Sequence, residues 1–214
     1  MEGKPVRVAS VLDDDTVTTV GNLEWFPLRR ELGVEAFGIN AFRAAKAGEP
    51  VIEEHVESPG QEEAYLVVSG SARIVVGEDA ITAPSGTIVF VPDPTLKRSG
   101  EALEDNTVVV AVGGWPDQPY HSLPWEPIYL AMDAMRRGDW AEAAETLERE
   151  AGEHRDTAII NYRLACCHAR LGETDLALDE LNRAIEINPD MRKRAGSEDH
   201  FASLRENFPD RFPA

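Results

Sequence analysis

The chain has 214 residues, of which 43% are hydrophobic and 28% charged, a composition typical of a folded globular protein with one large or two small cores. Its 39 acidic and 21 basic residues give a formal net charge of -18, which argues against nucleic acid or an anionic lipid surface as a partner. The opening MEGKPVRVASVLDDD carries charges where a secretory signal needs an apolar core, and no run approaches the roughly 20 apolar residues of a membrane span. We therefore expect a cytoplasmic protein.

A lead-in over residues 1–19 is followed by short β-type segments, which we assign to one domain over residues 20–115. The segments include AYLVVSG, ARIVV, AITA, TIVFVP and NTVVVAV, and turn signals such as SPG (58–60), GED (77–79) and PSG (84–86) separate them. Many short strands at regular spacing predict a β-barrel or β-sandwich.

After a linker at residues 116–125, the pattern becomes helical and repeats with a period of 34. The pairs that match at this period are Gly138 and Gly172, Leu130 and Leu164, Ala131 and Ala165, Ala143 and Ala177, and Leu147 and Leu181. A period of 34 is typical of helix-turn-helix units. The segment AIINYRLACCHARLGETDLALDELNRAIEINPD (158–190) resembles a tetratricopeptide repeat. We assign residues 126–208 to such repeats with a capping helix, and residues 209–214 to a tail, so the expected fold class is α+β.

Two further motifs lie within the strand-rich region. The first is Gly48, His55-x-Glu57, Glu63 and Gly70, and the second is Pro84-x-Gly86 followed by Val91-Pro92. Together they resemble the two signatures of the cupin family, which has a double-stranded β-helix barrel. The family pattern places a second histidine where this chain has Glu57, and a further histidine about five residues past Pro92, where this chain has Lys97.

This resemblance leaves three interpretations of the pocket. His55, Glu57 and Glu63 could hold a divalent nickel, iron, manganese or zinc ion, because two carboxylates would neutralise it and leave open positions. Alternatively, Lys97 projects into the place of the ion and pairs with Glu57 or Glu63, so that no cofactor is bound. We favour this second interpretation, because an ammonium cannot ligate a metal and would repel one. In the third, these polar groups only line a solvated barrel mouth.

The leading functional hypothesis is a non-enzymatic or vestigial cupin that binds a small molecule, coupled to a helical module that binds a protein or peptide. The expected pocket residues are His55, Glu57, Glu63, Tyr65 and Lys97, and no catalytic residue is assigned. Asn161 matches a repeat position whose side chain often faces the peptide groove, and it is the expected partner contact. The alternatives are a metal-dependent cupin enzyme that uses His55, Glu57 and Glu63, or a barrel that serves only as a dimerisation scaffold. We also expect a homodimer through the barrel, because the segment of residues 34–42 is partly apolar on both faces and a second copy would cover it.

Overall fold

The structure is a computed structural model that describes residues 6–11, 18–20, 22–121 and 123–213. Most of the expected lead-in, residues 1–5 and 12–17, lies outside the described residues, as do Gly21, Ser122 in the expected linker, and Ala214 at the end of the expected tail. The chain divides into two compact units, Met1–Ser122 and Leu123–Ala214.

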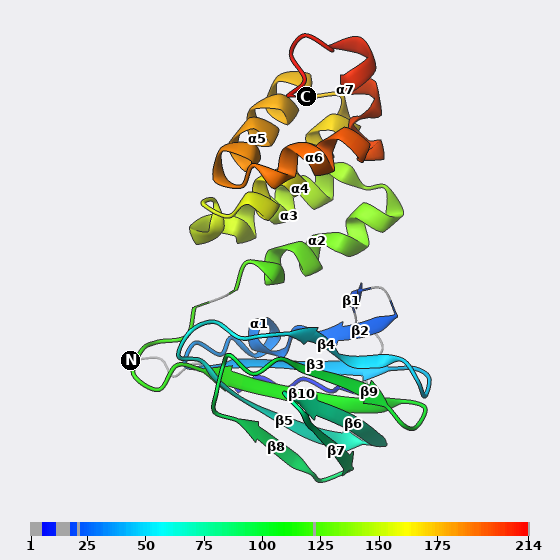
Figure 1. The fold of residues 1–214 in the computed structure, drawn as a ribbon, viewed down its shortest axis with the longest axis vertical. Helices are drawn as coiled ribbons and strands as arrows, with labels where there is room; N and C mark the ends of the chain where they lie inside the picture. Colours follow the sequence, from blue (N-terminus) through cyan, green and yellow to red (C-terminus); the bar gives the residue numbers. More distant parts are fainter. Residues whose placement is uncertain (1–5, 12–17, 21, 122, 214) are drawn as a thin grey trace. The chain divides into compact units, whose positions relative to one another are not determined.

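The first unit consists of two antiparallel β-sheets (Figure 1). One sheet has the strand order β1-β2-β3-β10-β5-β8 and the other has the order β4-β9-β6-β7. The strands are β1 (Thr18–Val20), β2 (Leu23–Phe26), β3 (Gly38–Ala44), β4 (Pro50–His55), β5 (Glu62–Ser69), β6 (Ser71–Val76), β7 (Asp79–Pro84), β8 (Ile88–Val91), β9 (Arg98–Ala102) and β10 (Thr107–Gly114). The two sheets are not closed into a barrel, so that part of the expectation is corrected to a two-sheet arrangement.

The core of this unit lies between the two sheets. Apolar side chains alternate along the strands, except in β4, where the neighbours Val51 and Ile52 are both buried. Those from the six-stranded sheet are Ala44, Tyr65, Val67, Val89, Val91, Val109 and Ala111, and those from the four-stranded sheet are Val51, Ile52, Ala72, Ile74, Ala83 and Ala102. The interior is therefore filled by protein side chains along most of its length.

Strand β4 is irregular where it approaches the candidate site. Ile52 pairs with Gly100 of β9 and His55 pairs with Arg98, so two residues of β4 stand opposite one residue of β9. Such a β-bulge shifts the alternation of side chains by one position. As a result, His55 follows Ile52 onto the inner face, and Glu54 points outward with its side chain 63% exposed.

Among the described residues, a small apolar cluster covers one end of the outer face of the six-stranded sheet. Helix α1 (Leu28–Leu32) and the end of β2 bring Leu28 and Phe26 against Ala41 of β3, and all three side chains are buried. Toward β8 the same face exposes Ile88 and Phe90, which are 65% and 57% accessible.

The second unit is a series of helices (Figure 1). They are α2 (Trp125–Arg137), α3 (Trp140–Ala151), η2 (Gly152–His154), α4 (Ala158–Leu171), α5 (Thr174–Ile187), α6 (Asp190–Ser197), η3 (Asp199–Phe201) and α7 (Ala202–Asn207). Gly138 and Gly172 end α2 and α4 in the left-handed conformation, with φ of 78° and 77°. Only glycine adopts this conformation without strain, which explains why the 34-residue period falls on these glycines.

Two apolar clusters hold the helices together, and small residues at the helix contacts let the backbones approach closely. Ala131, Ala143 and Leu147 belong to the cluster of α2, α3 and α4. Phe201 and Leu204 of the terminal helices belong to the cluster that covers α4 and α5. In the described part of the chain, no helix is both long enough and apolar enough to cross a membrane.

Candidate functional site

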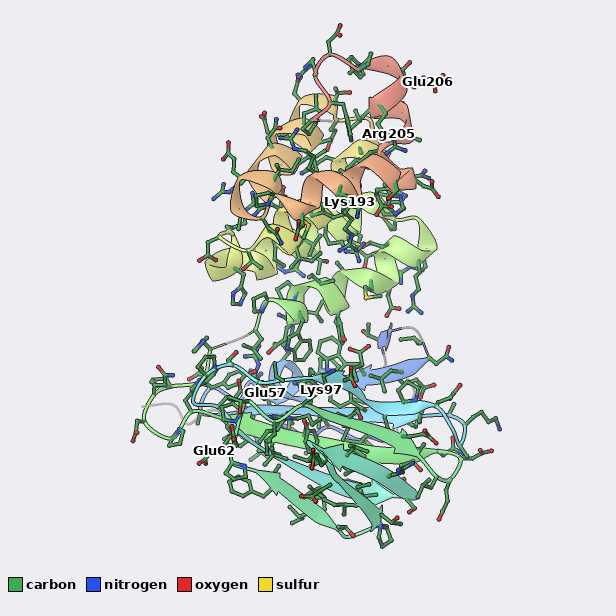
Figure 2. All side chains as sticks on the ribbon, in the orientation of Figure 1. Glu57, Glu62, Lys97, Lys193, Arg205 and Glu206 are labelled. Atoms are coloured by element: carbon green, nitrogen blue, oxygen red, sulfur yellow. The ribbon has the colours of Figure 1, made fainter. Side chains whose placement is uncertain are left out.

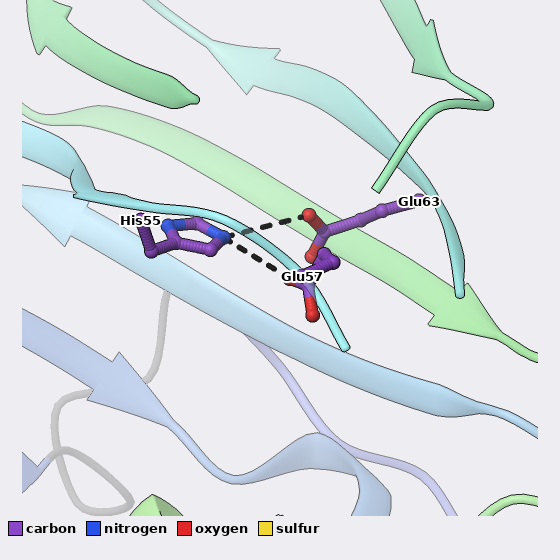
Figure 3. Close-up of side chains that lie close together, drawn as sticks. All are labelled: His55, Glu57 and Glu63. Carbon is purple, nitrogen blue, oxygen red and sulfur yellow. Dashed lines mark hydrogen bonds and ion pairs between the residues drawn. The ribbon is translucent and has the colours of Figure 1, made fainter. Parts of the chain in front are cut away.

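Three potential ligand side chains converge at one end of the two-sheet unit (Figure 3). His55 ends β4, Glu57 follows it by two residues, and Glu63 lies near the start of β5. The Nε2 atom of His55 lies 3.1 Å from Oε1 of Glu57 and 3.7 Å from Oε2 of Glu63. Their ligand atoms all lie within 4.8 Å of one another.

The local backbone explains this convergence. The bulge in β4 turns His55 inward, and Glu57, two residues farther along an extended segment, reaches the same side. Glu63 and Tyr65 are also two residues apart on β5, and both point between the sheets, while Glu62 points outward and is exposed. Only one of the adjacent carboxylates Glu62 and Glu63 therefore reaches the site.

A fourth charged residue, Arg98, lies directly behind the two carboxylates. Its side chain has no solvent exposure, and its Nη1 atom lies 3.4 Å from Oε2 of Glu63 and 4.0 Å from Oε1 of Glu57. Its Nη2 atom donates to the backbone carbonyl oxygens of Asp93, Pro94 and Leu96, at 3.0 to 3.1 Å. The guanidinium is thus fixed by the loop before β9 and held against the acidic pair.

Lys97 does not enter the pocket, and the expectation that it pairs with Glu57 or Glu63 is corrected. Its Nζ atom lies 2.9 Å from Oε1 of Glu54, and both side chains are more than 60% exposed. Both Lys97 and Glu57, which are not paired with each other, are labelled in Figure 2. The physical reason is strand alternation, because β9 directs Arg98 inward opposite His55 and leaves the neighbouring residue on the outside.

Tyr65 supplies a hydrogen-bond donor within the same cluster. Its side chain is 1% exposed, and its hydroxyl donates to Oε2 of Glu63. The same hydroxyl oxygen lies 3.4 Å from Nε2 of His55. Burial, followed by the negative charge of Glu63, raises the pKa of Tyr65. Tyr65 therefore remains a neutral donor at any ordinary pH.

The two acidic neighbours favour the protonated form of His55. Burial alone would lower the pKa of the imidazole, but hydrogen bonds to Glu57 and Glu63 outweigh it and raise the pKa to about 10. Burial alone would likewise raise the pKa of Glu57, whereas the hydrogen bond to His55 and the charge of Arg98 lower it. Near neutral pH the imidazolium of His55 therefore lies beside the ionised carboxylate of Glu57 and the guanidinium of Arg98.

The donor set is compatible with a metal ion, although the charges around it are not favourable. Separations of 3.1 and 3.7 Å suit ligands that share one ion at about 2.0–2.2 Å from each. Binding would require His55 to lose its proton, and a divalent ion would then leave the cluster with one excess positive charge, because Arg98 already neutralises one carboxylate. His55, Glu57 and Glu63 could hold an ion only against this repulsion.

Asn161 does not face a groove, so the expected partner contact is also corrected. The residue is fully buried, and its amide nitrogen donates to the carbonyl oxygens of Arg155 and Thr157, both at 2.9 Å. The side chain therefore closes the turn that leads into α4. It presents no surface to a binding partner.

Arg98 is the site residue that the sequence analysis missed. The signal was present in the β9 segment RSGEA, where Gly100 and Ala102 are small and alternate with the exposed Glu101. Counting back by two from Ala102 along the inner face reaches Arg98, not Lys97. Strand alternation would therefore have identified the inward-facing cation.

The sequence matches the family described as tetratricopeptide repeat over residues 130–192, which lie within the second unit. The helical unit contains tetratricopeptide repeats. This match agrees with the 34-residue period. The matched residues extend from within α2 to within α6.

The solved structures that resemble the chain include cupins. One is KdgF from Halomonas sp., with 12% identity and a TM-score of 0.40, covering 52% of this chain and 93% of that chain. Another is a cupin protein from Bacteroides fragilis, with 19% identity and a TM-score of 0.41, covering 56% and 93%. A putative sugar phosphate isomerase from Acidithiobacillus ferrooxidans has 22% identity and a TM-score of 0.39, covering 56% and 71%. This likeness concerns the fold and carries no activity over to this chain. A search of curated proteins gave no match.

Proposed function

We propose that the two-sheet unit is a vestigial, metal-free cupin that binds a small polar molecule at His55, and that the tetratricopeptide unit binds a protein partner. The observation that carries the first part is the buried guanidinium of Arg98, which lies 3.4 Å from Glu63 and 4.0 Å from Glu57. Arg98 thus provides the fixed positive charge beside the carboxylates that the sequence analysis assigned to its neighbour, Lys97.

Arg98 supports a metal-free site because its charge is permanent and its position is fixed. A guanidinium does not lose its proton in proteins, and its five donors suit carboxylate and carbonyl oxygens. Arg98 therefore offsets the charge of one carboxylate, and the protonated imidazole of His55 adds a second positive charge to the site. His55 is the most accessible member of the cluster, with its side chain 35% exposed, so a ligand would meet the imidazole first.

Metal content decides between this proposal and a metal centre. The full chain is purified without chelators from cells supplied with manganese, iron, nickel and zinc, and its metal content is measured by mass spectrometry. We expect far less than one ion per chain, and no change in melting temperature when each metal is added. A stoichiometric ion that is lost in His55→Ala would overturn the proposal.

Two variants test whether Arg98 is the residue that excludes metal. Arg98→Met should increase the affinity for divalent ions, whereas the matched surface variant Lys97→Met should behave as the wild type does. Circular dichroism confirms that each variant is folded, and Arg98→Gln, which also removes the charge but keeps hydrogen-bond donors, replaces Arg98→Met if that variant does not fold. Equal metal affinity in all of these folded proteins would contradict the role given to Arg98.

The ligand is sought by its effect on thermal unfolding. Compounds from a library of small polar metabolites are screened for an increase in melting temperature of the full chain. A ligand of the proposed site should lose its effect in His55→Ala and keep it in Lys97→Met. A complete screen in which every stabilising compound acts equally on both variants would locate binding elsewhere.

A metal-dependent cupin enzyme is the second candidate, favoured by one observation. The ligand atoms of His55, Glu57 and Glu63 lie within 4.8 Å of one another. A metal bound there would polarise a substrate carbonyl or activate water or dioxygen. This candidate predicts that Glu63→Gln removes both the bound ion and turnover while the fold survives.

For the tetratricopeptide unit, the accessible face of α5 is the best-supported partner surface. Leu176 and Ile187 are 51% and 41% exposed, and with the exposed Arg183 they follow the spacing of one helix face. A photo-reactive residue at position 176 should cross-link a partner that the same residue at Glu145, on α3, does not. The purified partner should then bind the full chain and lose affinity in Leu176→Glu, and equal affinity would refute this surface.

A further inference from the structure

A second depression lies on the outer face of the six-stranded sheet, on the side of β5 opposite the His55 cluster. Its volume is about 280 Å³, near the lower end of small-molecule sites. Its lining includes Phe37, Phe90 and Trp115, which come from three separate segments of the chain.

Small residues form the floor of this depression. On the outer face, Ala64 of β5 pairs with Phe90 of β8 and with Val112 of β10, and Glu62 pairs with Gly114. A Cβ atom added at Gly114 would lie 3.9 Å from Cα and Cβ of Phe37, so the missing side chain leaves space beside that residue. The hollow therefore exists because alanine and glycine stand between larger neighbours.

The aromatic walls are accessible, and one of them is firmly held. Phe37 and Phe90 are 42% and 57% exposed, a large exposure for phenylalanine. Trp115 donates its indole N–H to the carbonyl oxygen of Pro59 at 3.1 Å, and it stacks on His121 with ring centroids 4.1 Å apart. An aromatic lining that is already organised costs a ligand little ordering entropy.

The charge of the lining is negative. It includes Glu62 and Glu63 and no basic residue. The Glu63 carboxylate is engaged with Tyr65 and Arg98 on the other side of the strand, whereas Glu62 is exposed and has no ion pair among the residues that the structure describes. Glu62 is labelled in Figure 2. The available carboxylate therefore stands beside accessible aromatic rings.

We propose that this depression is a binding site for a small organic ammonium, with quaternary trimethylammonium groups as the best fit. Aromatic ring faces attract cations through their quadrupole, and the nearby carboxylate of Glu62 adds attraction. A quaternary ammonium is only weakly hydrated and carries apolar methyl groups, which suit a shallow aromatic hollow. The net charge of -18 favours the approach of any cation. This site does not rest on the function proposed at His55, although Glu63 borders both places.

Choline and its neutral isostere 3,3-dimethylbutan-1-ol test the proposal, because they share a shape and differ in charge. Each is titrated into the full chain at low ionic strength in a calorimeter, and proton spectra follow the methyl resonances. We expect choline to bind at least about tenfold more tightly than the isostere, with its methyl signals shifted upfield by the rings. Equal binding of the two compounds, or no binding of either, would overturn the proposal.

Three variants locate the site. Phe90→Leu keeps an apolar side chain but removes the quadrupole, and Glu62→Gln keeps the shape but removes the charge, so each should weaken choline binding several-fold. Ile88→Leu is the matched control, because Ile88 is exposed on the same face of β8 and lies outside the lining. Choline affinity that is unchanged in both Phe90→Leu and Glu62→Gln would refute the assignment.

The same face could instead be covered by a second copy of the chain. Sedimentation of the wild type and of Phe90→Leu separates the two occupants. The proposal expects the same oligomeric state for both proteins. A wild-type oligomer that Phe90→Leu dissociates, together with an absence of choline binding, would assign the face to self-association and overturn the ammonium site.

Discussion

At the scale of single residues, Arg98 connects the loop before β9 to the acidic pair. Its guanidinium satisfies backbone carbonyl oxygens on one side and faces Glu63 on the other. A buried cation of this kind is expensive to leave unpaired, and its carboxylate partners are equally expensive to leave without it. The residue therefore determines both the charge and the shape of the site.

The stability of two neighbouring variants should differ accordingly. Arg98→Met removes the buried positive charge beside Glu63 and the guanidinium hydrogen bonds to three carbonyl oxygens, so we expect a loss of about 3–5 kcal/mol in the free energy of unfolding. Lys97→Met breaks only an exposed ion pair and should cost at most about 1 kcal/mol. Urea denaturation of the full chain measures both, and similar losses would show that Arg98 is not held as described.

His55 gives the stability a characteristic dependence on pH. Its pKa is raised from 6.5 to about 10 in the folded protein, so its contribution is complete below pH 6.5 and is lost as the pH rises through about 10. Because a third of the imidazole is exposed, solvent screening reduces this contribution to about 1–2 kcal/mol. Urea denaturation at pH 6.5, 8 and 10.5 should show the loss in the wild type, and His55→Gln should lack it.

The residues of the cluster were only partly predictable from the sequence. The spacing of His55, Glu57 and Glu63 indicated that they would meet, and their ligand atoms do lie together. Counting residues past Pro92 selected Lys97, because a count along the chain does not record which face of a strand a residue occupies. The sequence predicted a positive charge beside the carboxylates, but it assigned that charge to Lys97 and not to Arg98.

At the scale of elements, the turns between helices depend on backbone conformation. Gly172→Ala should destabilise the protein by about 1 kcal/mol, because φ at this position is 77° and alanine is strained there. Gly196→Ala, within α6, should instead stabilise it by about 0.5–1 kcal/mol, because no contact closer than 4 Å and no positive φ oppose the methyl group. Thermal unfolding of both variants measures this difference in sign.

The helical elements were more predictable than their contacts. The 34-residue period identified the helix ends, because glycine is required at Gly138 and Gly172 for a conformational reason. Asn161 was assigned wrongly, because its amide is used to hold carbonyl oxygens at the start of α4. That hydrogen bonding depends on the path of the preceding turn, which a repeat pattern does not specify.

At the scale of the whole molecule, each unit buries a core of its own. The strand cluster and the two helix clusters contain no residue in common across the boundary at Ser122. We therefore expect the fragment of residues 123–214 to fold alone, with a helical circular dichroism spectrum and a cooperative thermal transition. A fragment that lacks a cooperative transition would show that its core is incomplete.

Homodimerisation through the two-sheet unit stays a prediction. If it is correct, sedimentation will find the full chain and the fragment of residues 1–122 as dimers and the fragment of residues 123–214 as a monomer. A monomeric full chain, or a dimer formed by the helical fragment, would refute it.

The irregular pairing between Ile52 and His55 has a consequence for comparing this chain with others. Deleting Glu53 would remove the extra residue between Ile52 and His55 and still leave the imidazole facing Arg98, since one residue would then separate the two. A one-residue length difference at this point would thus keep the histidine at the site. If a related chain lacked one residue here, an alignment could place its histidine out of register with His55. The histidine would then be counted as absent, although both chains would present an imidazole at the site.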